Sequence, residues 1–177
     1  NAGGDERVAQ SIAAWFVKGT KTYAGSRFRT KAGKKGFSKP KPRRIKGNPR
    51  RMRFDGKVAL LSSRYVMSSN EAFVLMMKQA AKCTVVGEPT FGSSGNPRPH
   101  DLPNGVRVFL PSWQALRPDG TCFEGEGIAP DIEVKVPDGV DGKDPILARI
   151  SPEGLLRVRN PAPGGVFGRN LLSTGRR

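Results

Sequence analysis

Apolar residues recur with a helical period near the start of the chain. They repeat on one side of the segment from Val8 to Phe16, and Asp5 precedes them at a position typical of a helix N-cap. This pattern predicts a helix over residues 5–17. The Gly-rich opening Asn-Ala-Gly-Gly leads directly into that helix, and such a turn normally follows a strand. We therefore expect the strand upstream of Asn1, and the chain to be an N-terminally incomplete fold.

Two short apolar runs flank a second helical pattern. Residues 57–63 and 83–87 are apolar over a length that suits buried strands. Between them, residues 64–68 predict a turn and residues 69–81 predict a helix. Its inner face is expected to comprise Phe73, Met76, Met77 and Ala80. Strand, helix and strand in this order predict a parallel βαβ unit with a right-handed crossover, so the fold class is α/β.

Turn signals dominate the rest of the chain. Asn104-Gly105 predicts a β-hairpin, and Asp119-Gly120 predicts a second turn. Later segments predict an edge strand over residues 127–136 and a short helix over 144–150. We expect one core domain over residues 1–150 and a weakly ordered Gly/Pro/Arg-rich tail over residues 151–177.

The positive charge of the chain is concentrated in one segment. The sequence has 31 Lys+Arg against 15 Asp+Glu. Residues 18–53 carry 15 of the basic residues and no acidic one, which leaves 16 basic against 15 acidic residues elsewhere. Because Gly and Pro interrupt it, this basic insert is predicted to be a solvated, flexible loop. The alternative is an electrostatic patch that attracts polyanions or acidic substrates.

The composition of the chain argues against a membrane-spanning segment, a disulfide framework and a metal centre. No apolar run approaches the roughly 18 residues of a membrane span. The two cysteines, Cys83 and Cys122, are too few for a disulfide framework or a four-thiolate zinc site. The single histidine, His100, argues against a multi-histidine metal centre. We therefore expect neither a metal nor another cofactor.

The turn before the second predicted helix carries a candidate for chemistry. Ser68 stands between a strand and a helix, where N–H groups at the helix start can stabilise an oxyanion. The same residues have a structural interpretation, because Ser68 and Glu71 have the spacing of a capping box. Taken alone, the spacing favours capping over catalysis.

The Gly3-Gly4 pair offers a second set of N–H donors. The turn after one parallel strand can lie beside the turn after its neighbour, so Gly3 or Gly4 is placed to face Ser68 across a pocket. The structural alternative is a plain turn that needs positive φ.

Five motifs occur along the chain in the order of a known family. They are Asn-Ala-Gly-Gly-Asp (1–5), Ser-Ser-Asn-Glu-Ala-Phe (68–73), Val-Gly-Glu-Pro-Thr-Phe-Gly (86–92), Leu-Pro-Asn-Gly-Val (102–106) and Phe-Glu-Gly-Glu-Gly-Ile-Ala-Pro-Asp-Ile-Glu-Val (123–134). Together they resemble the C-terminal processing (tail-specific) serine peptidases, especially the branch near the tricorn core and interphotoreceptor retinoid-binding protein. The resemblance implies a crotonase/ClpP-like ββα core, peptide or protein substrates, and an extracytoplasmic location.

Carried over residue by residue, the resemblance places Ser68 on the nucleophile. The N–H group of Ser69 then becomes one oxyanion donor, and that of Gly3 or Gly4 the other. Glu124 is the candidate for a glutamate that assists the general base in the tricorn-like branch.

The general base is the main departure from the family pattern. The tail-specific branch has a lysine where this chain has Ser93, which cannot act as that base. In the tricorn-like branch the base is a histidine well upstream of the nucleophile, which here would lie before Asn1. His100 is a possible substitute, although a lone histidine in a hairpin arm is more often a surface residue.

Three hypotheses remain. The preferred one is a serine peptidase that forms an acyl-enzyme on Ser68, with its general base not identified among these motifs. The second is an inactive relative that acts as a binding module with an apolar cleft. The third is a binder of nucleic acid or another polyanion that works through the basic insert.

Overall fold

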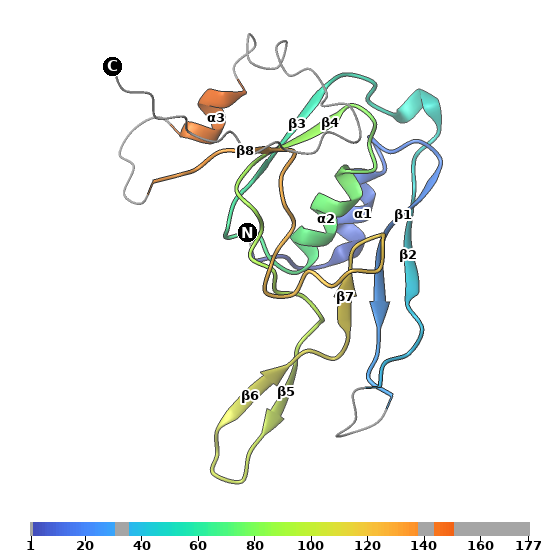
Figure 1. Cartoon of the computed structure of the whole chain (residues 1–177). Coiled ribbons are helices and arrows are strands. Elements are labelled where there is room, and N and C mark those ends of the chain that lie inside the picture. Colours follow the sequence, from blue (N-terminus) through green and yellow to red (C-terminus); the bar gives the residue numbers. More distant parts are fainter. Residues whose placement is uncertain (1, 31–35, 138–143, 151–177) are drawn as a thin grey trace, which may run out of the picture.

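The structure is a computed structural model that describes residues 2–30, 36–137 and 144–150, and it has a mixed α/β fold (Figure 1). The tail predicted for residues 151–177 lies outside the described residues. The elements are α1 (Glu6–Ala13), β1 (Thr20–Arg27), β2 (Lys41–Lys46), the 3₁₀ helix η1 (Arg50–Met52), β3 (Val58–Ser62), α2 (Ser69–Met77), β4 (Cys83–Gly87), β5 (Arg98–Asp101), β6 (Arg107–Leu110), β7 (Gln114–Leu116), β8 (Ile132–Glu133) and α3 (Pro145–Arg149).

The predicted parallel βαβ unit is confirmed. β3 pairs with β4 in parallel from Val58 opposite Cys83 to Ser62 opposite Gly87, and α2 connects the two strands. β8 adds to the other edge of β4, also in parallel, although it spans only two residues of the strand predicted over 127–136. The C-terminal ends of these strands therefore meet at one edge of the sheet, beside the start of α2.

The basic insert is not the flexible loop that its composition predicts. β1 and β2 pair antiparallel within it, and β7 joins the free edge of β1 to give the order β2-β1-β7. The hairpin buries Tyr23, Ala24 and Ile45. The sequence signal was weak because β2 contributes one buried aliphatic residue, and lysines, arginines and a proline fill its other positions. Packing against the core outweighed the low β propensity of the charged residues.

The core forms where α2 contacts α1, β1 and β3. Met76, Met77 and Ala80 lie on the buried side of α2, as predicted, whereas Phe73 is only partly buried. In α1, which ends four residues before the predicted limit, the apolar stripe is not the buried face, since Val8 is 58% and Ile12 is 49% exposed. The small residues Ala13 and Ala14 face inward instead, and their size permits close packing against α2.

The predicted turns are confirmed. β5 and β6 form an antiparallel hairpin whose turn contains Gly105 at φ +81°, and the hairpin projects away from the rest of the molecule (Figure 1). Asp119 and Gly120 form the second turn, which pairs Leu116 with Cys122. In the part of the chain that the structure describes, no helix is long and apolar enough to cross a membrane.

Candidate active site

Ser68 has a strained backbone conformation at the start of α2. Its φ is +57° and its ψ is −127°, and Asn96 is the one other described non-glycine residue with positive φ. Left-handed φ values are unfavourable for a residue with a Cβ, and they persist where surrounding contacts determine the backbone. The strain places Ser68 on a sharp turn between β3 and α2. Ser68 is also the N-cap of α2 with Glu71 at the N3 position, so the capping interpretation is confirmed as well.

The Glu71 carboxylate holds this turn together from inside the core. Glu71 is fully buried and accepts four hydrogen bonds. Oε1 accepts from the Thr90 hydroxyl and the Gly92 N–H, both at 2.7 Å. Oε2 accepts from the N–H groups of Ser68 at 3.0 Å and Ser93 at 3.1 Å. One side chain thus joins the Ser68 turn to the loop over residues 90–93.

The four hydrogen-bond donors around Glu71 determine which protonation state of its carboxyl group fits the site. Burial raises the pKa of the Glu71 carboxyl, and the hydrogen bonds from Thr90, Gly92, Ser68 and Ser93 act in the opposite direction. All four partners donate, so an ionised carboxylate accepts every one of them, whereas a protonated oxygen would face another donor. The sequence pointed to Glu71 as a capping residue, and its contact with the loop at 90–93 required the tertiary fold.

Gly3 and Gly4 lie directly beside the turn at Ser68. A Cβ on Gly3 would lie 2.8 Å from the Ser69 nitrogen and 3.0 Å from the Ser68 Cβ. The Ser69 hydroxyl donates to the Gly4 carbonyl at 2.5 Å. Gly3 also has φ +89°, which favours glycine. The structure therefore brings the glycine pair at residues 3–4 into contact with the serine pair at residues 68–69, although the two pairs are far apart in the sequence.

Ser68 opens onto a cavity of about 480 Å³, which we call the serine cavity. Its apolar wall includes Ala72 and Leu75 of α2 together with Trp113 and Phe123. The loop over residues 94–97 and the start of α1 complete the lining. A cavity lined by both apolar and polar groups suits the binding of a ligand.

Arg43 is a residue of the serine cavity that sequence reasoning missed. It comes from β2 in the basic insert, and its side chain is only 18% exposed. Its guanidinium pairs with the Glu6 carboxylate and lies 4.8 Å from the centre of the Trp113 ring and 5.4 Å from that of Tyr23. Burial lowers the pKa of Arg43 to about 10. Arg43 lies in a run of basic residues, which predicted a side chain exposed to solvent. The pairing of β1 with β2 turns this side chain inward instead.

The remaining predicted residues are placed as follows. The Ser93 carbonyl accepts from the Ser68 N–H at 2.8 Å, so position 93 lies in direct contact with the candidate nucleophile. Glu124 is exposed and accepts from the Ser94 N–H at 3.1 Å, but it does not line the serine cavity. His100 is exposed on β5, in the projecting hairpin, and likewise lies outside that lining.

Residues that could hold a metal ion do not gather in the described ranges. Among residues 2–30, 36–137 and 144–150, no group of three or more His, Cys, Asp or Glu side chains has metal-binding geometry. Cys83 and Cys122 are both free thiols.

Comparison with known proteins identifies relatives of this arrangement. The profile of peptidase family S41 matches residues 1–134. A probable CtpA-like serine protease of Staphylococcus epidermidis is 31% identical over 83 residues, which are 47% of this chain and 17% of that protein. The chain thus spans a small part of its curated relatives.

Two solved structures are similar over most of the chain. The crystal structure of a putative peptidase from Parabacteroides merdae has a TM-score of 0.72 and 28% identity, and covers 78% of this chain and 43% of that one. The photosystem II D1 C-terminal processing protease has a TM-score of 0.57 and 20% identity, and covers 92% of this chain and 37% of its own. The second likeness concerns the fold alone.

Proposed function

Because this chain belongs to peptidase family S41, we propose that it carries the nucleophile of a serine peptidase and that Ser68 is that nucleophile. The observation that supports this most directly is the strained turn at Ser68, which opens onto the serine cavity. A helix cap alone does not need a left-handed φ, since an N-cap residue normally has an extended backbone. A strained serine between a strand and a helix is the arrangement that exposes a nucleophilic hydroxyl.

The proposed reaction is acyl transfer. The Ser68 Oγ attacks the carbonyl carbon of a peptide bond while a general base takes its proton. The N–H groups of Ser69 and of Gly3 or Gly4 stabilise the oxyanion of the tetrahedral intermediate. The C–N bond then breaks, the amine leaves with the proton, and water hydrolyses the acyl-enzyme and regenerates Ser68.

We propose that the general base comes from outside the lining of the serine cavity. That lining contains neither histidine nor lysine in the described part of the chain. Ser93 occupies the position at which the tail-specific branch has its lysine. We propose a histidine supplied from outside this chain, with Glu124 assisting it from the rim beside Ser94.

The substrate we propose is an unfolded segment or the C-terminus of a polypeptide, bound in extended form beside a strand. We further propose that the core is crotonase/ClpP-like, that residues 1–150 form its domain, and that the protein acts in an extracytoplasmic compartment. These proposals extend the resemblance of the chain to C-terminal processing peptidases. A contact between polyanions and the basic insert is a separate proposal, motivated by its 15 basic residues.

A specific observation favours a second candidate function. The serine at position 93, in contact with Ser68, fits a relative that has lost its base. Such a protein would bind peptides in the serine cavity without cleaving them.

A fluorophosphonate probe separates these two functions. The probe is applied to the 177-residue chain and to the full product of its gene, each beside its Ser68→Ala variant. We expect the full product to be labelled, and the label to vanish with Ser68→Ala. Labelling of the 177-residue chain itself would locate the base within it and draw attention to His100. A folded full product without any label would overturn the peptidase proposal and leave the binding module.

A further inference from the structure

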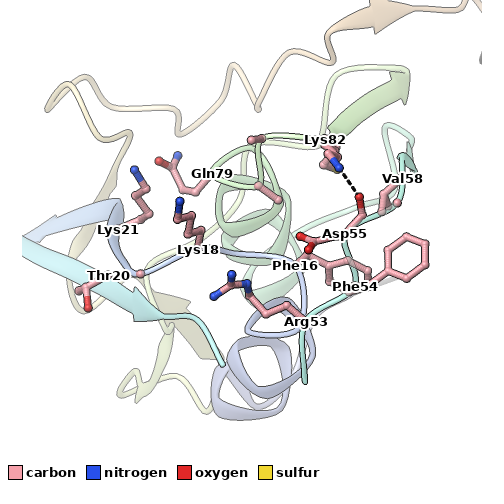
Figure 2. A pocket seen from close by; sticks show the side chains of 15 residues that line it. Phe16, Lys18, Thr20, Lys21, Arg53, Phe54, Asp55, Val58, Gln79 and Lys82 are labelled. Atoms are coloured by element: carbon pink, nitrogen blue, oxygen red, sulfur yellow. Dashed lines mark hydrogen bonds between the residues drawn. The ribbon is translucent and has the colours of Figure 1, made fainter. Parts of the chain in front are cut away.

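A second cavity lies at the opposite end of α2 from Ser68. It measures about 640 Å³, and residues 79–83, which follow the last turn of α2, form part of its lining. The remainder comes from the segment after α1 together with the start of β1, and from the segment that leads into β3 together with the first residue of that strand (Figure 2). We call it the cationic cavity. It shares no residue with the serine cavity.

Positive charge gathers around this cavity. Lys18, Lys21 and Arg53 of the basic insert line it together with Lys82, and Asp55 is the one acidic residue of the lining. Figure 2 shows Lys18 and Lys21 next to Gln79, and the hydrogen bond from the Lys82 ammonium to the Asp55 carbonyl lies across the cavity from them. The lining thus has a formal net charge of +3, from four basic side chains and one acidic side chain. Several cations around one concave site attract an anionic ligand.

The walls of the cationic cavity also contain apolar groups. Phe16 and Phe54 contact each other edge to face, with ring centres 6.0 Å apart and planes at 69°. Phe54 is 54% exposed, and Val58 and Ala80 extend the same wall. A ligand with charged groups alone would not cover this apolar wall, which would stay in contact with water. The site therefore suits a ligand that has carboxylates next to aromatic or aliphatic side chains.

These features lead to one ligand class. We propose that the cationic cavity binds an acidic peptide segment, with Lys18, Lys21 and Arg53 contacting its carboxylates and Phe16 and Phe54 contacting its apolar side chains. Choosing a peptide as the ligand rests on the proposed peptidase function, because a peptidase encounters polypeptide chains. The edge-to-face phenylalanine pair also offers a poor stacking platform for successive bases, which disfavours single-stranded nucleic acid.

The consequence for the protein is selection of substrates at a distance from the reaction. A long polypeptide held at the cationic cavity by its acidic segment would be delivered to the serine cavity at a raised local concentration. This explains in physical terms why part of the basic insert packs at the end of α2 that lies away from Ser68. The site adds binding energy without any change to the reacting groups.

The test is a binding measurement that does not depend on catalysis. A fluorescein-labelled peptide in which Glu alternates with Phe is titrated with the Ser68→Ala protein, and anisotropy is followed. The matched probe has Gln in place of every Glu. We expect the acidic peptide to bind at least tenfold more tightly than its Gln counterpart at low salt.

A pair of double variants locates the binding site. Lys18→Glu with Lys21→Glu reverses two charges of the cationic cavity, and we expect it to weaken the acidic peptide about tenfold or more. Lys39→Glu with Lys41→Glu makes the same change of net charge in the same insert, on exposed residues outside the cavity. This control should change affinity less than threefold. Thermal unfolding of both variants checks that each is folded.

The outcomes distinguish this inference from the proposed function. Equal weakening by the two double variants would show diffuse attraction by the insert and overturn the site. Tighter binding of a single-stranded oligonucleotide, sensitive to the same Lys18 and Lys21 changes, would overturn the ligand class. If the cavity binds the peptide but fluorophosphonate fails to label Ser68, the peptidase proposal fails alone. Labelling of Ser68 without peptide binding would refute only the cationic cavity.

Discussion

The two ends of helix α2 carry opposite kinds of site. At the N-terminal end, a buried carboxylate and backbone hydrogen bonds hold Ser68 in a strained conformation. At the C-terminal end, exposed lysines with long side chains surround a cavity. The same nine-residue helix thus separates a site built on a buried hydrogen-bonded carboxylate from a site lined by exposed charged side chains.

The difference shows what each end can do. A reacting hydroxyl gains from exact placement, because a displacement of about 1 Å can cost two orders of magnitude in rate. A site that recognises charge gains little from such rigidity, since Coulomb attraction changes slowly with distance. The direction of the helix agrees with this division, because the N–H groups at its start would stabilise the oxyanion of the proposed reaction and its C-terminal carbonyls favour nearby lysine side chains.

The sharpest way to break this comparison is Glu71→Gln. The amide keeps the size of the side chain but points an N–H₂ group at two donors when it replaces Oε2, the N–H groups of Ser68 and Ser93, so two of the four hydrogen bonds are lost. We expect unfolding free energy to fall by about 2 kcal/mol and the fluorophosphonate labelling rate of Ser68 to fall about a hundredfold. Both are measured on the full gene product at a temperature where circular dichroism shows the variant folded.

Glu133→Gln is the matched control for this change. Glu133 is exposed on β8, and the same chemical substitution there should alter neither quantity. Peptide binding at the cationic cavity should also survive Glu71→Gln. Equal labelling of the wild type and the Glu71→Gln variant would show that Glu71 does not position the nucleophile.

Gly3→Ala is expected to have a smaller effect at the same end of α2. The new Cβ would lie 2.8 Å from the Ser69 nitrogen and 2.9 Å from the Met67 carbonyl oxygen, so the backbone must shift. Alanine at φ +89° adds strain of about 1 kcal/mol. We expect the labelling rate to fall about tenfold, measured by gel fluorescence over time.

Gly105→Ala separates the steric effect from backbone strain. Gly105 has nearly the same φ, +81°, but a Cβ there would meet nothing within 4 Å. It lies in the β5–β6 turn, away from Ser68. Should both alanine variants lower the labelling rate equally, the close approach of Gly3 to the nucleophile turn would not matter for the reaction.

The smallest effect is expected at Cys83, which lines the cationic cavity. Burial raises the pKa of the Cys83 thiol to about 11, so the reactive thiolate is scarce at pH 8 and its alkylation accelerates as pH rises toward 10. In a Cys122→Ser protein at pH 9, the acidic peptide should slow iodoacetamide alkylation about threefold by covering the cavity. The Gln peptide is the control, and an unchanged rate with the acidic peptide would place it elsewhere.

The local elements of this fold were largely predictable. The apolar runs of β3 and β4 and the helical pattern between them predicted the βαβ unit. The predicted burial of the first run was too high, because β3 is mostly half-buried and its Leu61 is 40% exposed. Asn104-Gly105 and Asp119-Gly120 located their turns through residues that accept positive φ or bond to their own backbone. The motif order led to the family that the comparisons established.

The prediction of a flexible loop for the basic insert was wrong because charged residues surround the one core residue of a strand. β2 has one buried aliphatic residue, Ile45, and its lysines and arginines gave the signal of a solvated loop. In α1 the error was the opposite one. The apolar stripe predicted the packed face, but that stripe is exposed, and Ala13 and Ala14 pack against the core instead. Small or isolated core residues give weak periodic patterns in the sequence. Their burial becomes evident only from the elements that pack against them in the tertiary structure.

By itself, the sequence determined which segments form the βαβ unit and which serine stands at the start of α2. Propensity, periodicity and turn chemistry act over a few residues, so they can be recognised without knowledge of distant partners. The tertiary structure decided that Glu71 joins the Ser68 turn to the loop at residues 90–93, and that Arg43 turns into the serine cavity. Those contacts join residues far apart in the chain, and no local pattern encodes which of them meet.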